Sequence, residues 1–527
     1  MADTVREIER KYEATDDTPL PDLTLGGRVA AVVEQGVTAL DATYYDTADL
    51  RLAAAGITLR RRTGGEDAGW HLKLPVAPDV RDEVRAPLSD ELPQELAALV
   101  RSRTPGRELL PVVRLRTRRT VHLLKGADGA PLAELAVDAV RARPADRPGS
   151  EARWHEIEVE LTAQDADPTL LDEIGEALEA AGIRPAASRS KLARALAETG
   201  QEPRPGAPGE RPGAPGKRSG GKPPTAGDVV LRYVREQVRV IVELDPAVRR
   251  DLPDAVHRMR VATRRLRSAF RSYTKVLDRS VTRPAGVELK WLAAELGVDR
   301  DREVLTARLR DALAGLPRTL RLGPVSARLR LWSQRRRLNS RREVLAVLDS
   351  ERYLELLRTL EALLAAPPLR KAAARPAPQV LAKAVRKDHA RLAARVEVAL
   401  RTPRGTARDE ALHSARKAAK RARYAAEAAR PVLGGPAKKF AKHTKRVQQV
   451  LGDHQDSVVA RAALRELATQ AHRAGEGGFT FGLLHGREEA LAAERERELP
   501  GVWAKLVRSA PAVGTKAVGK KAVGKKA

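Results

Sequence analysis

The chain has 527 residues and carries 97 lysines and arginines against 69 aspartates and glutamates, for a formal net charge of +28. This length predicts about two to four domains, and an apolar content of 42% excludes a wholly disordered chain. There is no cysteine, which excludes disulfides, a thiol nucleophile, cysteine-bound zinc and iron–sulfur clusters. Only 3% of the residues are aromatic, which favours closely packed helices over an aromatic-rich all-β protein.

Basic and acidic residues are distributed unevenly along the chain. Residues 1–198 contain 27 basic and 35 acidic side chains, whereas the remaining 329 residues contain 70 basic and 34 acidic ones. A Pro- and Gly-rich stretch in which RPGAPG occurs twice separates the two parts. We therefore predict an N-terminal domain at 1–199, a flexible linker at 200–227, a helical domain at 228–510 and a disordered Lys-rich tail at 511–527.

Alternation of apolar and polar residues runs through the N-terminal part and predicts strands. The alternating stretches are 5–12, 43–47, 57–62, 70–75, 112–124, 132–140 and 153–161. Helical spacing predicts helices near 27–35, 91–102, 168–181 and 189–197. Many short strands without a Gly-rich phosphate loop indicate an antiparallel barrel or sandwich.

The polar phase of these strands is charged and is segregated by sign. Acidic faces carry Glu7 with Glu9 and Glu156 with Glu158 and Glu160, and basic faces carry Arg60 with Arg62 and Arg114 with Arg116 and Arg118. For any one strand, a solvated outer face with scattered ion pairs is the alternative. If the faces converge inside one barrel, the carboxylates can hold a hard divalent cation and the basic groups can clamp an oligophosphate. This combination indicates metal-assisted hydrolysis of a phosphoanhydride.

Glu7-Ile8-Glu9-Arg10-Lys11 matches the ExExK signature of CYTH domains, the triphosphate tunnel metalloenzymes. An ordered series after it also resembles that family, over about residues 3–197: Tyr45 to Thr47, Leu59 to Arg62, Lys73, Arg81 with Glu83, the Arg run 114–119, Asp138 and the strand EIEVE. The resemblance implies an eight-stranded antiparallel β tunnel with helices, which binds a triphosphate along its axis and acts with Mg2+ or Mn2+.

The resemblance also implies roles for individual residues. The metal ligands would be Glu7, Glu9, Asp138, Glu156 and Glu158. The triphosphate ligands would be Lys11, Arg60, Arg62, Lys73, Arg81, Arg116, Arg118 and Lys191. Glu9 and Lys11 are the expected catalytic residues, with Glu9 orienting the attacking water. Because a slip of one residue turns every side chain of a strand to its other face, the inward members of the runs 60–62 and 114–119 depend on strand register.

From residue 228 onward the pattern becomes helical and repeats itself. The segment 257–270 aligns without gaps on 413–426 with six identities, and 296–305 matches 451–460 at nearly the same offset. Two motifs in the same order predict an internal duplication. On the first helix, basic residues from His257 to Arg271 lie opposite Met259, Ala262, Leu266, Phe270 and Tyr273; on the second, residues from His413 to Arg423 lie opposite Ala415, Ala422, Ala426 and Ala429.

These helical motifs resemble the CHAD domain over about residues 226–508, with Glu303 standing where the family favours aspartate. The resemblance implies two four-helix bundles, related by pseudo-symmetry, around a basic surface that binds inorganic polyphosphate. The polyphosphate ligands would be His257, Arg260, Arg264, Arg267, His413, Arg416, Lys420, Arg423, Lys290, Lys442 and Lys445. The expected fold class is therefore multidomain, an α+β tunnel followed by duplicated all-α bundles.

The expected function is a metal-dependent triphosphatase that hydrolyses inorganic tripolyphosphate or a related triphosphate and is tethered to polyphosphate by its helical domain. The alternatives are an adenylate cyclase or a thiamine triphosphatase on the same barrel, and a non-catalytic polyphosphate-binding protein. No helix-turn-helix or aromatic RNA-binding pattern occurs, so no specific nucleic-acid partner is expected. The sequence contains neither a signal-peptide pattern nor an apolar run of roughly 18 residues, which predicts a cytoplasmic protein without a membrane partner. The resemblance to CHAD domains further implies association with polyphosphate granules.

Overall fold

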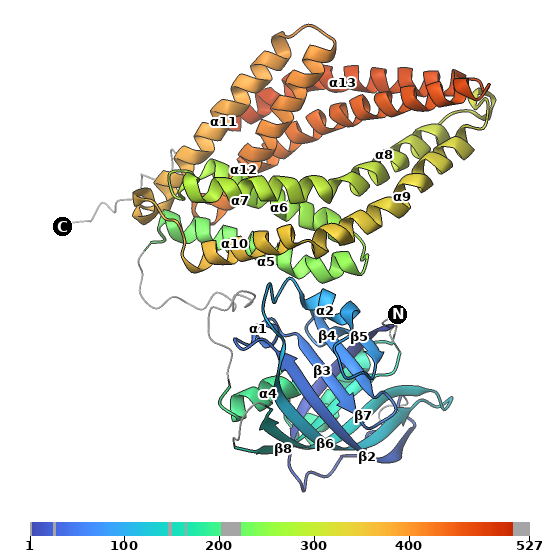
Figure 1. Cartoon of the computed structure of the whole chain (residues 1–527), viewed down its shortest axis with the longest axis vertical. Coiled ribbons are helices and arrows are strands. Elements are labelled where there is room, and N and C mark those ends of the chain that lie inside the picture. Colours follow the sequence, from blue (N-terminus) through green and yellow to red (C-terminus); the bar gives the residue numbers. More distant parts are fainter. Residues whose placement is uncertain (1–2, 25–27, 146–149, 164–165, 202–222, 510–527) are drawn as a thin grey trace, which may run out of the picture. The chain divides into compact units, whose positions relative to one another are not determined.

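The computed structural model describes residues 3–24, 28–145, 150–163, 166–201 and 223–509, without the side chains of 298–303 and 334–340. The chain divides into two compact units, Met1–Gly216 and Lys217–Ala527 (Figure 1). Most of the predicted linker, the predicted Lys-rich tail and the side chain of Glu303 lie outside the described residues.

The N-terminal unit is a closed antiparallel barrel of eight strands, as expected. The strands follow one another around the barrel in the order β1-β5-β4-β3-β2-β6-β7-β8. They are β1 (Asp3–Ala14), β2 (Ala31–Asp46), β3 (Thr58–Thr63), β4 (Gly69–Ala77), β5 (Val80–Pro87), β6 (Leu110–Lys125), β7 (Pro131–Pro144) and β8 (Ala152–Leu161). Closure leaves the barrel without an exposed edge strand and encloses one face of every strand.

Short helices accompany the barrel: α1 (Arg51–Ala54), α2 (Gln94–Val100), α3 (Thr169–Ala180) and α4 (Lys191–Glu198). The helices α2, α3 and α4 confirm the helices predicted near 91–102, 168–181 and 189–197. The helix predicted near 27–35 is wrong, because its described part from Ala31 onward belongs to β2, which pairs with β6 from Ala31 opposite Lys125. Strand pairing here overrides the local pattern. The strand β5 was not predicted, since its buried Asp82 and Glu83 stand next to each other and break the alternation.

Helices pack on both faces of the sheet, so apolar residues occupy different faces in different strands. α3 places Leu170, Ile174 and Leu178 against the outward residues Leu135 and Ile157. α2 covers the outward residues of β3 and β4 in the same way. In contrast, α4 packs against Leu115, Val140 and Trp154, which have the inward orientation of the cavity-lining residues on their strands. α4 therefore sits at one end of the barrel interior.

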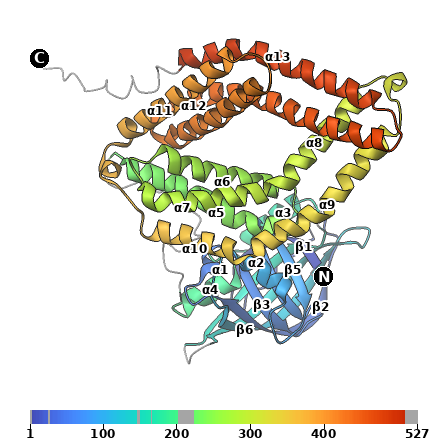
Figure 2. The ribbon, with the colours of Figure 1, turned by 45° about the horizontal axis from the view of Figure 1, so that its top comes forward.

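The C-terminal unit is helical. Its helices are α5 (Ala226–Arg249), α6 (Ala255–Ser272), α7 (Arg279–Glu295), α8 (Gly297–Ala314), α9 (Val325–Asp349), α10 (Glu351–Ala365), α11 (Ala377–Arg401), α12 (Thr406–Arg473) and α13 (Phe479–Ser509), with 3-10 turns at Arg318–Leu320 and Lys371–Ala374. Within this unit, α8 runs beside α9 and α12 beside α13 (Figure 2). No helix in the described part of the chain combines the length and apolar composition that a bilayer crossing requires.

The duplicated motifs occupy equivalent positions in the two halves of the helical unit. A Cβ added to Gly297 would lie 2.7 Å from Nη2 of Arg260, and one added to Gly452 would lie 3.5 Å from the guanidinium of Arg416. In both copies the arginine of the basic motif thus packs over the glycine of the second motif. The second copy differs in that α12 continues through the kink at Gly434, where φ is 59°, whereas the first copy divides into separate helices.

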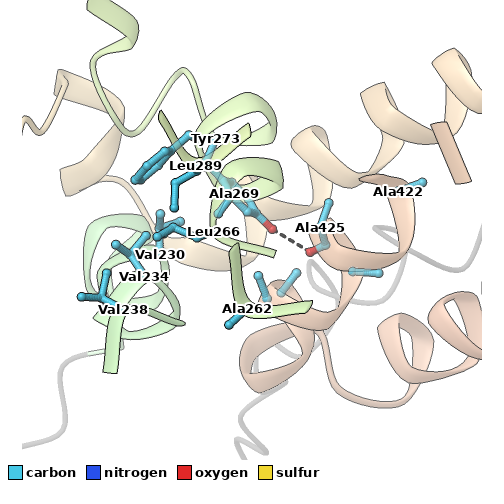
Figure 3. Packing of buried hydrophobic residues seen from close by; sticks show 14 of the residues in the cluster. Val230, Val234, Val238, Ala262, Leu266, Ala269, Tyr273, Leu289, Ala422 and Ala425 are labelled. Carbon is cyan, nitrogen blue, oxygen red and sulfur yellow. Dashed lines mark hydrogen bonds between the residues drawn. The ribbon is translucent and has the colours of Figure 1, made fainter. Parts of the chain in front are cut away.

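The apolar faces predicted for the two basic helices are buried. Met259, Leu266 and Phe270 in α6 and Ala422 and Ala426 in α12 all belong to one core. Alanines on α12 allow its backbone to approach α6 closely (Figure 3). At this contact the hydroxyl of Tyr273 donates a 2.6 Å hydrogen bond to the carbonyl oxygen of Ala425. The bond joins the two copies of the repeat.

Replacing Tyr273 with phenylalanine removes this buried hydrogen bond while keeping the ring. We expect the helical unit to lose about 1–2 kcal/mol of stability, because a buried carbonyl oxygen loses a donor. Urea unfolding of the full chain, followed by the helical circular-dichroism signal, measures the loss. Tyr233→Phe is the matched control, since the Tyr233 hydroxyl has no hydrogen-bond partner among the described residues. Equal stability of the two variants would contradict a role for the bond in joining the copies.

Candidate functional site

The barrel encloses a cavity of about 840 Å3 that is lined mainly by charged side chains. Every second residue of a strand points inward, so Glu7, Glu9 and Lys11 of β1 reach the cavity together. The other strands and α4 add further charges of both signs: Arg60, Arg62, Lys73, Arg81, Glu83, Arg85, Arg119, Glu134, Glu158, Glu160 and Lys191. The interior of the barrel is therefore filled with charge rather than with a hydrophobic core.

One group of ion pairs, which we call the Glu83 cluster, lies between β1, β4 and β5. Nζ of Lys73 is 2.5 Å from Oε2 of Glu7, 3.9 Å from Oε2 of Glu9 and 3.9 Å from Oε1 of Glu83. Arg85 pairs with Glu83 and Glu7, and Nη1 of Arg81 is 3.7 Å from Oε1 of Glu9. Each buried carboxylate here is thus neutralised by a cationic side chain of a neighbouring strand.

A second group, the Lys191 cluster, lies between β7, β8 and α4. Nζ of Lys191 is 2.8 Å from Asp138, 2.8 Å from Glu156 and 2.5 Å from Glu158. Arg119 adds bonds to Asp138 and Glu158, and Lys11 also contacts Glu158. Lys191 is the first residue of α4, where the helix dipole disfavours a positive charge. The three carboxylates therefore offset both this unfavourable position and the burial of the ammonium group.

Glu7 differs in protonation from two other buried carboxyl groups of the clusters, those of Glu9 and Asp138. Burial raises the pKa of Glu7 to about 7, against the opposing effect of Lys73. Burial would also raise the pKa of Glu9, but Lys11 and Lys73 hold it well below its usual range. The pKa of Asp138 is likewise held below its usual range, because Lys191 and Arg119 outweigh the effect of burial. Glu9 and Asp138 are therefore ionised near neutral pH, while Glu7 can still take up a proton.

The structure divides the five predicted metal ligands between the two clusters. The carboxylate oxygens of Asp138, Glu156 and Glu158 lie within 4.8 Å of one another. Glu7 and Glu9 instead belong to the Glu83 cluster. In the described residues of the barrel, the three carboxylates around Lys191 are thus the convergent set that could hold a divalent cation.

Six of the eight predicted triphosphate ligands line the cavity: Lys11, Arg60, Arg62, Lys73, Arg81 and Lys191. The inward orientation expected for Arg116 and Arg118 is wrong. The Arg116 side chain is 58% exposed and lies 3.3 Å from the outward Asp41, and Arg118 is also exposed. The inward cation of β6 is Arg119, which pattern reasoning missed.

A signal for this register was present in the sequence. Val113 and Leu115 are buried and share the orientation of Arg119, so the apolar phase of β6 points to the correct face. The same rule fails in β3, where the buried Leu59 faces outward under α2 and Arg60 faces the cavity. Which face an apolar residue takes thus depends on where a helix packs.

The basic residues predicted on the helical unit occupy several environments. His257, Lys290, Lys442 and Lys445 are exposed, whereas Arg264, Arg267, His413, Arg416, Lys420 and Arg423 are partly buried. Arg260 is only 8% exposed, so its expected place on an exposed basic stripe is wrong. The reason is its close packing over Gly297.

The partly buried basic residues already have neighbours within the helical unit. Arg423 pairs with Glu427 at 2.9 Å and also donates a hydrogen bond to Gln448. Burial, aided by Lys417, lowers the pKa of His413, which favours the neutral ring in the free protein. An anion that binds at this surface would have to compete with Glu427 for Arg423.

Two domain families match this chain. The CYTH domain family matches residues 5–196 and the CHAD domain family matches residues 232–465. An uncharacterized protein of Mycobacterium tuberculosis, Rv2226, is 40% identical over 507 residues, which cover 93% of this chain and 94% of that protein. Human thiamine-triphosphatase is 44% identical over 80 residues, which cover 15% of this chain and 31% of that protein. The CHAD domain of Ricinus communis, a solved structure, is 26% identical with a TM-score of 0.44 and covers 57% of this chain and 97% of that one.

Replacing Lys191 with methionine would remove the ammonium group from among three carboxylates and keep much of the side chain. We expect a loss of about 3 kcal/mol in the presence of a chelator, because breaking a buried pair leaves uncompensated charge. Added Mg2+ should raise the stability of the Lys191→Met variant by more than it raises the stability of the wild-type protein. Thermal unfolding with EDTA and with MgCl2 measures both effects.

The matched control is Arg194→Met in the same helix, because Arg194 pairs with Glu13 and Glu198 and not with the three carboxylates. If Mg2+ shifted the unfolding temperatures of the two variants equally, the Lys191 ammonium group would not occupy the binding position of a metal cation.

Proposed function

Since this chain belongs to the family of proteins that join a CYTH domain to a CHAD domain, we propose that it is a divalent-metal-dependent triphosphatase. Its substrate would be inorganic tripolyphosphate or a related triphosphate, and the helical unit would tether it to polyphosphate. One observation carries the catalytic part of the proposal: cationic side chains and ionised carboxylates line a single enclosed cavity of the barrel. Such a cavity suits an oligophosphate bound together with a cation.

The cationic residues of the cavity would bind the phosphate groups. Lys11, Arg60, Arg62, Lys73 and Arg81 come from four different strands, and Arg119 takes the place predicted for Arg116 and Arg118. Fixed guanidinium and ammonium groups recognise phosphate oxygens through charge-assisted hydrogen bonds without a covalent intermediate. Because each of these cations has an internal carboxylate partner, a bound triphosphate would have to displace those carboxylates.

The carboxylates of the Lys191 cluster fit a divalent cation. Their oxygens lie within 4.8 Å of one another, and the Lys191 ammonium group lies among them where a metal cation could bind. When bound, Mg2+ or Mn2+ would neutralise the charge that develops on the transferred phosphoryl group. The ionised Glu9 would orient the attacking water, and Lys11, which lies 3.5 Å from Glu9, would hold the phosphoryl group beside it.

Thiamine triphosphate is the second candidate substrate, favoured by the similarity of an 80-residue segment to thiamine-triphosphatase. The cavity side chains named above would contact the triphosphate group that both candidates share. A substrate comparison is therefore needed to identify the organic group, if there is one.

For the helical unit, inorganic polyphosphate is the proposed ligand. The net positive charge of the chain lies entirely in its C-terminal part, on which Lys290, Lys442 and Lys445 are exposed. When cationic side chains bind a linear polymer of closely spaced phosphates, the polymer releases its counterions, and this release favours binding. Binding would then weaken steeply with added salt.

We expect the full chain to release phosphate from tripolyphosphate faster than from ATP or thiamine triphosphate in the presence of Mg2+ or Mn2+, and to lose activity in EDTA. Glu9→Gln should lower kcat by about 100-fold, because it removes the group that orients the water. A phosphate-release assay on the three substrates decides. Formation of cyclic AMP without phosphate release would identify a cyclase instead, and no turnover with any substrate would identify a binding protein.

Arg119 and its neighbour Arg118 test which face of β6 meets the substrate. Arg119→Gln should lower kcat/KM by about 10- to 100-fold, because it removes a charge-assisted contact worth roughly 1.5–3 kcal/mol. Arg118→Gln should leave kcat/KM unchanged, since Arg118 is exposed outside the barrel. Steady-state kinetics measures both, with thermal unfolding as a check that each variant is folded. An equal loss in the two variants would refute the assignment.

A further inference from the structure

Three side chains of the helical unit converge at a site that the proposed function does not use. Asp409 lies near the start of α12, His454 in the second half of that helix and Glu496 in α13. The ligand-type atoms of these residues lie within 4.8 Å of one another. A histidine nitrogen and two carboxylate oxygens form a donor set typical of protein metal sites.

The geometry around His454 fits coordination better than hydrogen bonding. Its side chain is only 3% exposed, and Nε2 lies 3.4 Å from Oδ1 of Asp409 and 3.4 Å from Oε1 of Glu496. Nε2 has no hydrogen-bond partner among the described residues. Ordinary N–H···O bonds measure about 2.9 Å, whereas ligands about 2.1 Å from a tetrahedral metal are about 3.4 Å apart. Nε2 therefore lies at the spacing of metal ligands from each of the two oxygens.

Neighbouring arginines orient both carboxylates. Nη2 of Arg461 donates a 3.1 Å hydrogen bond to Oδ2 of Asp409, and Nε of Arg408 lies 3.1 Å from Oε2 of Glu496. Each guanidinium thus contacts the outer oxygen and leaves the inner oxygen directed at His454. Groups that hold the ligands in this way are common around metal sites. Nε of Arg404 also lies 3.6 Å from Oε2 of Glu496. The three positive charges lower the affinity for a cation, so the ligand geometry must supply the binding energy.

The site is accessible to a small ion. Asp409 lines an open hollow of about 390 Å3, together with His413, Lys417 and Gln455. A metal site needs such an entry path in addition to its ligands. His454 and Glu496 are not among the residues that line the hollow, so the path from it to the site runs past Asp409.

We propose that Asp409, His454 and Glu496 bind a divalent transition metal, with Zn2+ as the best match to one nitrogen and two oxygen ligands and one open position. This site is separate from the carboxylates of the barrel, which offer oxygen ligands alone. The two can therefore be distinguished by spectroscopy in the intact chain.

The test uses the metal-free full chain with Co2+ and Zn2+ as probes. The intensity and energy of the visible absorption of bound Co2+ depend on its coordination number and donor atoms, so both change when a nitrogen ligand is lost. Equilibrium dialysis counts bound Zn2+. The variant His454→Gln removes the nitrogen ligand, and Asp409→Asn weakens an oxygen ligand that is partly exposed. His472→Gln is the matched control, because His472 is exposed near the end of the same helix.

We expect His454→Gln to lose about one bound Zn2+ per chain and the nitrogen-dependent Co2+ absorption. Asp409→Asn should bind Zn2+ at least about tenfold more weakly, and His472→Gln should behave as the wild type. Unchanged stoichiometry and spectrum in His454→Gln would overturn the proposal. X-ray absorption of wild-type protein with bound Zn2+ needs no variant, and the absence of a histidine ligand there would also overturn it.

Discussion

The mutual neutralisation of buried charges inside the barrel is the interaction on which the rest of the N-terminal unit depends. An isolated carboxylate or ammonium group in this enclosed space would cost several kcal/mol. The barrel avoids that cost by placing carboxylates of β1, β5, β7 and β8 within reach of cations from β4, β5, β6 and α4. The interior therefore suits charged ligands. Each cationic side chain that pairs with a carboxylate could instead bind an anion, and each carboxylate could instead bind a cation.

The closed sheet and α4 make this arrangement possible. Closure turns the alternation of each strand into a single charged lining, and it does so for strands that are far apart in the sequence. The apolar face of α4 packs against Leu115 and Trp154, which brings Lys191 into the carboxylates of β7 and β8. The helical unit is built differently, because its apolar residues form the core, while Lys290, Lys442 and Lys445 are exposed outside it. Under the proposed function, the barrel would take an enclosed triphosphate and the helical unit a long polyphosphate.

The fold is predictable from the sequence where local patterns carry the information. Alternation predicted seven of the strands, and the paired basic motifs predicted the duplication in which Arg260 and Arg416 pack over equivalent glycines. Such patterns fail where tertiary packing decides. Arg119 rather than Arg118 faces the cavity because β6 meets α4 on its inner side, while β3 meets α2 on its outer side. The residues Asp409, His454 and Glu496 are brought together by helix packing, and no spacing in the sequence predicts that contact.

We propose that a metal ion and a triphosphate enter the barrel together, because each takes over the partners of the other. The Mn2+ affinity of the full chain, measured by electron paramagnetic resonance with and without a non-hydrolysable triphosphate analogue, tests this coupling most directly. We expect the analogue to raise Mn2+ affinity by about tenfold or more beyond its own chelation of Mn2+ in solution. An unchanged or weaker Mn2+ affinity would contradict it.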